Sequence, residues 1–192
     1  MLIISYLLSK FNYNLYIFLN TDYLYNNNGS DFMKLKYMTL TALATAFIFA
    51  TTIMIQIPNG IGGYIHLGDG LLLLFASILP PQYAFIAAGL GSSLADLLSG
   101  YTIYVLPTFI IKGLMGVTFS TLSKNKAQTI LGYLACTFIL VLGYFITEWI
   151  LYQSISVALV SVVPNIIQIG CGCILATLLN PLIVRLNQMV FK

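Results

Sequence analysis

Three acidic residues, Asp69, Asp96 and Glu148, are the only ones after position 32 of this 192-residue chain. Each is expected near the same end of an apolar segment, so the three predict a polar site at one face of a membrane. Carboxylates there can accept hydrogen bonds from a bound molecule or balance its positive charge. Catalysis is not indicated, because one histidine provides neither a Ser-His pair beside it nor a set of metal ligands. We therefore predict no catalytic residue, no metal and no cofactor.

Further polar residues recur at helical spacing and are expected to share helix faces with these acids. Tyr104, Thr108 and Lys112 lie at i, i+4 and i+8, and Tyr144 precedes Glu148 by four residues. Aromatic walls with a few directed hydrogen-bonding groups suit a small, flat, polar ring compound. The candidate substrate-binding residues are Tyr64, His66, Asp69, Ser92, Asp96, Tyr104, Thr108, Lys112, Tyr144, Glu148, Asn165 and Gln168.

Lys112 is expected about eight residues inside a membrane span, where a charge costs ~2.5–3.5 kcal/mol and requires a partner. Two interpretations are open. Either Asp96 and Lys112 pair only with each other, or the acids receive donor groups of a ligand and Lys112 meets an oxygen or a carboxylate. Other candidates also have purely structural interpretations: Glu148 as an interfacial residue beside Trp149 and Tyr152, His66 as an exposed or capping residue, and Asn165 and Gln168 as contacts between helices.

The elements that must position these residues follow from composition. With 59% hydrophobic and 7% charged residues and a mean hydropathy of +0.95, the chain cannot cover a water-soluble globule with polar groups. Continuous apolar runs without alternation exclude a transmembrane barrel. We predict an all-α integral membrane protein, one bundle of six transmembrane helices. The expected spans are residues 37–56, 71–79, 82–98, 104–122, 129–151 and 157–186, the second being short because Pro80 and Pro81 end it.

Six spans place both termini on one side, and the basic residues identify that side as cytoplasmic. Lys34, Lys36, Lys124, Lys126, Arg185 and Lys192 all fall at that face. The loops at 57–70, 99–103 and 152–156 are then external. The basic residues form no patch with interleaved aromatics, so nucleic acid is not an expected partner. Residues 1–32 are expected to be a poorly ordered appendage or to precede the true start at Met33, which leaves 33–192 as the membrane domain.

Three segments carry a resemblance to a known family: Gly63-Tyr64-Ile65-His66-Leu67-Gly68-Asp69, the run from Gly89 to Tyr101, and Ile111-Lys112-Gly113-Leu114-Met115-Gly116. They resemble the substrate-binding S components of energy-coupling factor (ECF) vitamin transporters, in the branch that contains predicted pyridoxine and hydroxymethylpyrimidine transporters. The similarity runs from about Met33 to the C-terminus. In that family an Ala-xxx-Ala stripe on the first helix contacts the coupling protein, and Ala42, Ala46 and Ala50 match it.

The resemblance implies a subunit of the bacterial cell membrane that captures a small vitamin or precursor at the outer face. It implies docking on a transmembrane coupling protein with two ATPase subunits, and a lid formed by the first external loop. The chain lacks a Walker-type phosphate loop, so it is expected to be a transport subunit and not an enzyme. The alternative is a self-contained secondary transporter or channel for a small polar solute, which would work without ATPases.

Overall fold

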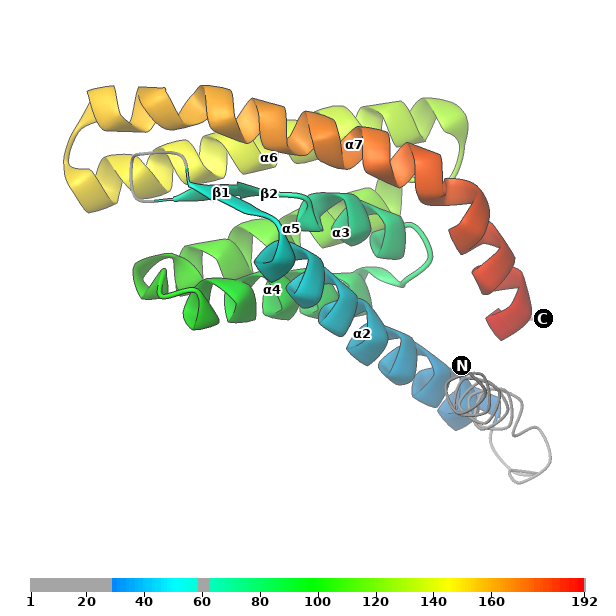
Figure 1. The fold of residues 1–192 in the computed structure, drawn as a ribbon. Helices are drawn as coiled ribbons and strands as arrows, with labels where there is room; N and C mark the ends of the chain where they lie inside the picture. The colour runs from blue at the N-terminus through cyan, green and yellow to red at the C-terminus, as the bar shows by residue number, and fades with distance from the viewer. Residues whose placement is uncertain (1–28, 59–62, 192) are drawn as a thin grey trace, which may run out of the picture.

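The structure, a computed structural model, describes residues 29–58 and 63–191. The described residues are mostly helical (Figure 1). The helices are α2 (Gly29–Met54), α3 (Gly68–Ala76), α4 (Pro81–Leu98), α5 (Val105–Leu122), α6 (Lys126–Tyr152) and α7 (Ile155–Phe191), with a 3-10 turn η2 (Thr102–Tyr104) before α5. The prediction of an all-helical membrane bundle is confirmed at this level. The expected appendage lies outside the described residues except for its last four positions, which already belong to α2.

Four of the described helical segments are long and apolar enough to cross a membrane: Met33–Met54, Thr102–Leu122, Lys126–Tyr152 and Ile155–Met189. Helix α4 has 18 residues, but Ser92, Ser93 and Asp96 make it more polar. Helix α3 has nine residues and spans only ~14 Å at 1.5 Å per residue, about half of a hydrocarbon core. The crossing of the membrane by all six helices therefore stays a prediction.

Helix α3 is the centre of the bundle. Eight of its nine residues are buried, and it packs against α2, α5 and α7. In Figure 1 it lies between the α6–α7 pair on one side and the α4–α5 pair on the other. Its first turn therefore carries Asp69 into the interior, where polar side chains of the neighbouring helices can reach it.

The Gly-, Ala- and Ser-rich segment of α4 allows close helix packing. A Cβ atom on Gly116 of α5 would lie 2.5 Å from the carbonyl oxygen of Ala84, and one on Gly91 of α4 would lie 2.9 Å from that of Thr45. Neither distance leaves room for a side chain. Small residues let helix backbones approach closely in membranes, so these positions bring α2 and α5 directly against α4.

The loop between the first two helices contains a hairpin that the sequence did not reveal. Strands β1 (Gln56–Pro58) and β2 (Tyr64–His66) pair antiparallel, with Gln56 opposite His66 and Pro58 opposite Tyr64. Three-residue strands are too short to show a period-two pattern, which explains why the sequence predicted only a loop. Alternation along β2 places Tyr64 and His66 on the same face of the hairpin.

The two ends of the bundle differ in charge. In Figure 1 the beginning of α2, the α5–α6 connection and the end of α7 lie at one end, while the hairpin and the α6–α7 turn lie toward the other. The predicted topology residues Lys34, Lys36, Lys124, Lys126 and Arg185 belong to the elements at the first end.

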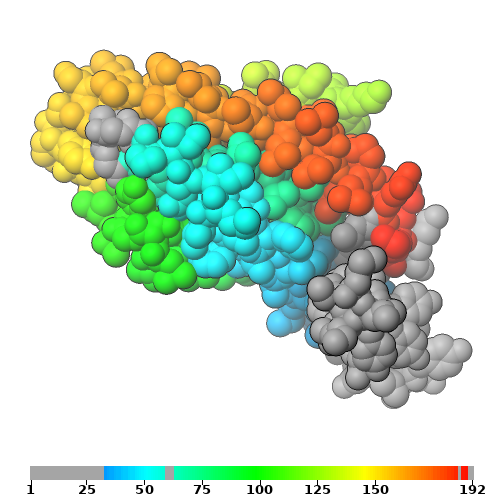
Figure 2. All heavy atoms as spheres, in the orientation of Figure 1, coloured from blue at the N-terminus to red at the C-terminus, as the bar shows by residue number. Residues whose placement is uncertain are grey.

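One face of α2 is not covered by the other residues that the structure describes. Leu40, Ala44 and Ile48 are buried against the bundle, whereas Ala42 and Ala46 are exposed and Ala50 is half-buried. Figure 2 shows α2 and the hairpin at the surface of the molecule. The alanine stripe therefore does not serve packing among the described residues of this chain.

Candidate functional site

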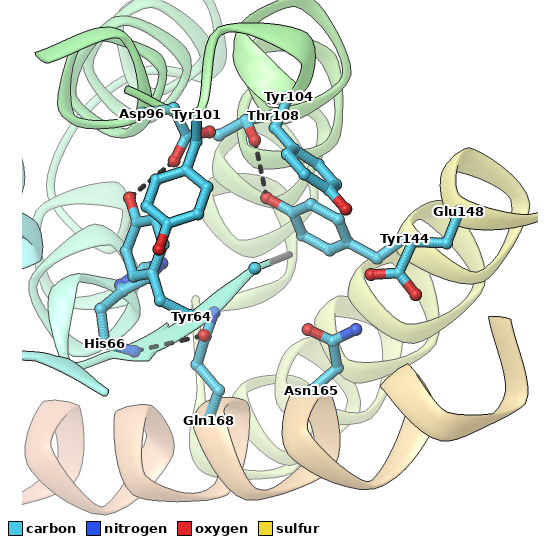
Figure 3. A pocket seen from close by; sticks show the side chains of 11 residues that line it. Tyr64, His66, Asp96, Tyr101, Tyr104, Thr108, Tyr144, Glu148, Asn165 and Gln168 are labelled. Carbon is cyan, nitrogen blue, oxygen red and sulfur yellow. Dashed lines mark hydrogen bonds between the residues drawn. The ribbon is translucent and has the colours of Figure 1, made fainter. Parts of the chain in front are cut away.

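A cavity lies where the hairpin meets α4, α5, α6 and α7 (Figure 3). It encloses about 390 Å³ of empty space, part of which is open to the outside. The residues that line it are Gly63, Tyr64, His66, Asp96, Tyr101, Tyr104, Thr108, Tyr144, Glu148, Asn165 and Gln168. Nine of the twelve predicted binding residues are in this set, brought together from segments up to a hundred residues apart.

Four of the eleven lining residues are tyrosines, and several of them are held by hydrogen bonds. The rings of Tyr64 and Tyr101 lie 4.8 Å apart between centroids. The hydroxyl of Tyr144 is 2.9 Å from Thr108 Oγ1 on α5. That of Tyr104 lies 3.2 Å from the hydroxyl of Tyr152. Tyr rings present flat apolar faces together with a polar tip, so this wall can both stack on a ring and hydrogen-bond its substituents.

Two carboxylates in the cavity wall have unused hydrogen-bonding capacity. Asp96 is 6% exposed and Glu148 is 3% exposed. Tyr64 donates its hydroxyl hydrogen to Asp96 Oδ1 at 2.6 Å. Asp96 Oδ2 and Glu148 Oε2 are buried and have no hydrogen-bond partner among the described residues. Buried polar atoms nearly always have partners, so these two oxygens mark the place where a bound molecule would supply them.

The position of Glu148 excludes its interpretation as an interfacial residue. Trp149 and Tyr152 are 47% and 43% exposed on the outer surface, as an aromatic belt requires. Glu148 instead points inward from α6, toward the space between Tyr144 and Asn165 in Figure 3.

Lys112 has the partner that its depth requires, but the partner is Asp69 and not Asp96. Lys112 Nζ donates to Asp69 Oδ1 at 2.6 Å, and both side chains are fully buried. Gln168 Nε2 donates to Asp69 Oδ2 at 2.7 Å, and Gln168 Oε1 accepts from the backbone N–H of His66 at 3.3 Å. The chain of contacts joins α5, α3, α7 and β2. The proposed Asp96–Lys112 pair is therefore wrong, because the re-entrant α3 brings a different acid to the lysine.

The same geometry removes Lys112 and Asp69 from the cavity wall. Neither lines it, and the positive charge of Lys112 is already balanced by Asp69. Lys112 therefore has no free charge with which to neutralise a carboxylate in the cavity. Ser92, the third predicted residue outside the wall, is buried one turn before Asp96 and also does not line the cavity.

His66 both lines the cavity and caps α3. The side chain is 6% exposed, and Nδ1 accepts a hydrogen bond from the N–H of Gly68 at 3.1 Å. This bond requires Nδ1 to be unprotonated. Burial lowers the pKa of His66 to about 4, against the opposing influence of the Asp69 carboxylate. The imidazole in this hairpin is therefore neutral at pH 7 and contributes no positive charge to the cavity.

Sequence reasoning missed Tyr101 and Gly63 in the wall. Tyr101 follows Gly100, whose φ of +84° ends α4, and the Tyr101 N–H donates to the Asp96 carbonyl at 2.8 Å. This helix-ending turn folds Tyr101 back beside the Asp96 side chain. The Ser-Gly-Tyr sequence after the helix was the available signal. Gly63 has no side chain, and its place in the wall depends only on the hairpin.

A helical membrane bundle with a partly open polar cavity near one end is typical of a membrane ligand-binding or transport subunit. Residues 32–185 match the family described as "ECF-type riboflavin transporter, S component". The chain belongs to this family of vitamin-transporter subunits. It is also similar to the thiamine precursor transporter HmpT of Lactococcus lactis subsp. cremoris, with 31% identity over 81% of this chain and 92% of the relative. An uncharacterised protein of Pyrococcus woesei is 35% identical over 55% of this chain and 73% of its own length.

Proposed function

We propose that this chain captures a single-ring vitamin or vitamin precursor, either hydroxymethylpyrimidine or a pyridoxine-type vitamer. The observation that carries the proposal is the tyrosine-lined cavity with two buried carboxylates. Tyrosine faces beside two buried carboxylates suit one aromatic ring with polar substituents. A relative that this chain covers to 92% of its length is named as a transporter of a thiamine precursor, which supports a vitamin precursor as the cargo.

The cavity opens toward the outer face of the cell membrane in this proposal. All six helices cross or re-enter the membrane, and both termini are cytoplasmic. Support comes from the basic residues, which belong to the end of the bundle away from the hairpin. Cytoplasmic ends of membrane helices are enriched in Lys and Arg, so the hairpin end is the external one. The hairpin then forms the lid over the bound molecule.

Import requires a transmembrane coupling protein and two ATPase subunits, which would use ATP that this chain does not bind. The exposed side of α2 around Ala42 and Ala46 is the proposed contact, since small residues permit close helix approach and no other element between residues 29 and 191 that the structure describes covers these two alanines. Replacing Ala46 with Leu is expected to reduce co-purification of the coupling protein without changing ligand affinity. Cys171→Leu, at an exposed position on α7, is the matched control.

The cargo is tested by thermal shift of the purified, detergent-solubilised chain against pyridoxine, pyridoxamine, hydroxymethylpyrimidine, thiamine, riboflavin and biotin. A ligand at 100 times its Kd stabilises the folded state by ~2.7 kcal/mol, which is a visible shift. We expect a single-ring compound to stabilise the protein most. Stabilisation by riboflavin alone contradicts the proposed cargo. Uptake that persists after deletion of the ATPase genes would favour the self-contained transporter.

A further inference from the structure

The charges around the cavity restrict its ligand further. Asp96 and Glu148 lie on opposite sides of the cavity, with tyrosine rings between them (Figure 3). The described lining contains no Lys or Arg, and His66 is neutral. Lys112, the cation closest in the fold, is fully buried against Asp69. The site therefore presents two acidic groups with no free cation to balance them.

Each acid has one oxygen prepared for a donor. Asp96 Oδ1 is already engaged by Tyr64 of the hairpin, which leaves Oδ2 for another group. Glu148 Oε2 is likewise buried and unpartnered among the described residues. An ionised acid accepts hydrogen bonds and cannot donate them, so a molecule that satisfies both must carry donors at two separated edges.

We propose that Asp96 and Glu148 select a nitrogen-containing aromatic ring that bears hydrogen-bond donors on two opposite edges and no acidic group. This inference rests on the proposed function and names the chemistry of its ligand. One acid meets a ring nitrogen that carries a proton, and the other meets an amino, aminomethyl or hydroxymethyl group across the ring. The tyrosines cover the flat faces of the ring.

The arrangement predicts rejection of acids and phosphate esters. A carboxylate or phosphate on the ring would face Asp96 or Glu148, and like charges in a buried site repel strongly. Lys112 Nζ lies 5.6 Å from the centroid of the Tyr144 ring, but its charge is already paired with Asp69. Such a ligand would also leave the two free oxygens without donors, which is costly in a buried site. The phosphorylated forms of the same vitamers are therefore excluded by charge even where they fit by size.

The test measures Kd by titration calorimetry on the full chain in detergent. The ligands are hydroxymethylpyrimidine, pyridoxamine, pyridoxic acid, the phosphate esters of the first two, and a hydroxymethylpyrimidine analogue with C–H in place of the ring nitrogen opposite the amino group. We expect a donor-bearing neutral or cationic ring to bind at least tenfold more tightly than its acid or phosphate counterpart. The analogue is expected to lose at least tenfold in affinity.

Two near-isosteric variants assign the effect to the acids. Asp96→Asn and Glu148→Gln are each expected to weaken binding of the preferred ring by about ten- to a hundredfold, since hydrogen bonds to charged groups contribute more than neutral ones. Ser93→Ala is the matched control, because Ser93 is buried three residues before Asp96 on the same helix, lies outside the cavity wall, and donates its hydroxyl hydrogen to the Leu90 carbonyl. It is expected to retain parental affinity. A melting curve for each variant establishes that it is folded.

The outcomes separate this inference from the proposed function. Equal affinity for an acid or a phosphate ester, or unchanged affinity in both Asp96→Asn and Glu148→Gln, overturns the selection by charge while single-ring capture stands. Riboflavin binding without any single-ring ligand, or folded protein that binds no ligand of either set, overturns the proposed function itself. Tight binding of the donor-bearing ring, lost in the two variants and kept in Ser93→Ala, supports both.

Discussion

The buried pair of Lys112 and Asp69 makes a prediction that tests the packing of the whole bundle. Asp69→Asn leaves the lysine charge buried without a counter-charge, and Lys112→Met leaves the carboxylate with only the amide of Gln168. Breaking one partner of a fully buried ion pair destabilises a protein by about 3–5 kcal/mol. The double variant carries neither charge and is expected to recover most of that loss, because a neutral replacement of similar volume is often nearly as stable.

The expected size of the effect can be expressed as a melting temperature. For a chain of this length 1 kcal/mol corresponds to about 2–4 °C, so each single variant is expected to melt about 6–20 °C lower than the parent. The interaction energy of the cycle is the loss in the double variant minus the sum of the two single losses, and because the double variant is expected to lose less than either single variant, its magnitude is expected to be about 3 kcal/mol or more. Fluorescence of Trp149, the one tryptophan in the chain, or differential scanning fluorimetry reports the transition.

A second cycle discriminates between the two possible acids. Asp96→Asn combined with Lys112→Met is expected to give much weaker coupling than the Asp69 cycle, since Asp96 bonds to Tyr64 and not to the lysine. Strong coupling in the Asp96 cycle and none in the Asp69 cycle would refute the placement of α3 against α5. That result would favour the pairing of Asp96 with Lys112, which the sequence alone allows.

Three further results are expected. Gly116→Ala is expected to destabilise the protein by about 1–3 kcal/mol, because the added methyl group would overlap a backbone carbonyl of α4. Gly170→Ala is the control, since a Cβ atom there would have no described neighbour outside its own turn of helix within 4 Å. It is expected to be neutral or stabilising in a melting assay. His66 has a pKa of about 4 in the folded state, below the ~6.5 of a histidine in an unfolded chain. Between these two pH values the unfolded state binds more protons than the folded state. The melting temperature is therefore expected to fall as the pH drops from 7 toward 4. His66→Gln is expected to flatten that slope, and an unchanged slope would assign the pH dependence to other groups. Tyr64→Phe removes the bond from the hairpin to Asp96 and is expected to raise the ligand dissociation rate about tenfold or more in stopped-flow measurements, whereas an unaltered rate would show that this bond does not retain the ligand.

The membrane class and most residues of the cavity wall can be predicted from the amino-acid sequence alone. Helices with apolar runs of 18 or more residues present more apolar surface than a water-soluble fold can bury, so the sequence predicts a helical membrane bundle. The polar candidates were found because charged and amide side chains are rare inside apolar helices, so each one requires a partner or a ligand. Helical spacing then identified Tyr104 with Thr108, and Tyr144 with Glu148, as residues of shared faces, and all four line the cavity.

Which of these polar groups contact one another depends on how the helices pack. The sequence does not distinguish Asp69 from Asp96 as the partner of Lys112. In the fold, α3 packs in the core and places Asp69 against Lys112. Asp96, near the end of α4, instead accepts a hydrogen bond from Tyr64 of the hairpin. The tyrosine after Gly100 and the short hairpin also escaped sequence analysis, because a single turn and three-residue strands produce no periodic signal. Spacing along one helix specifies a face, but partners on different helices are chosen by how those helices pack. This packing buries Lys112 against Asp69, so the charged side chains that line the cavity are Asp96 and Glu148.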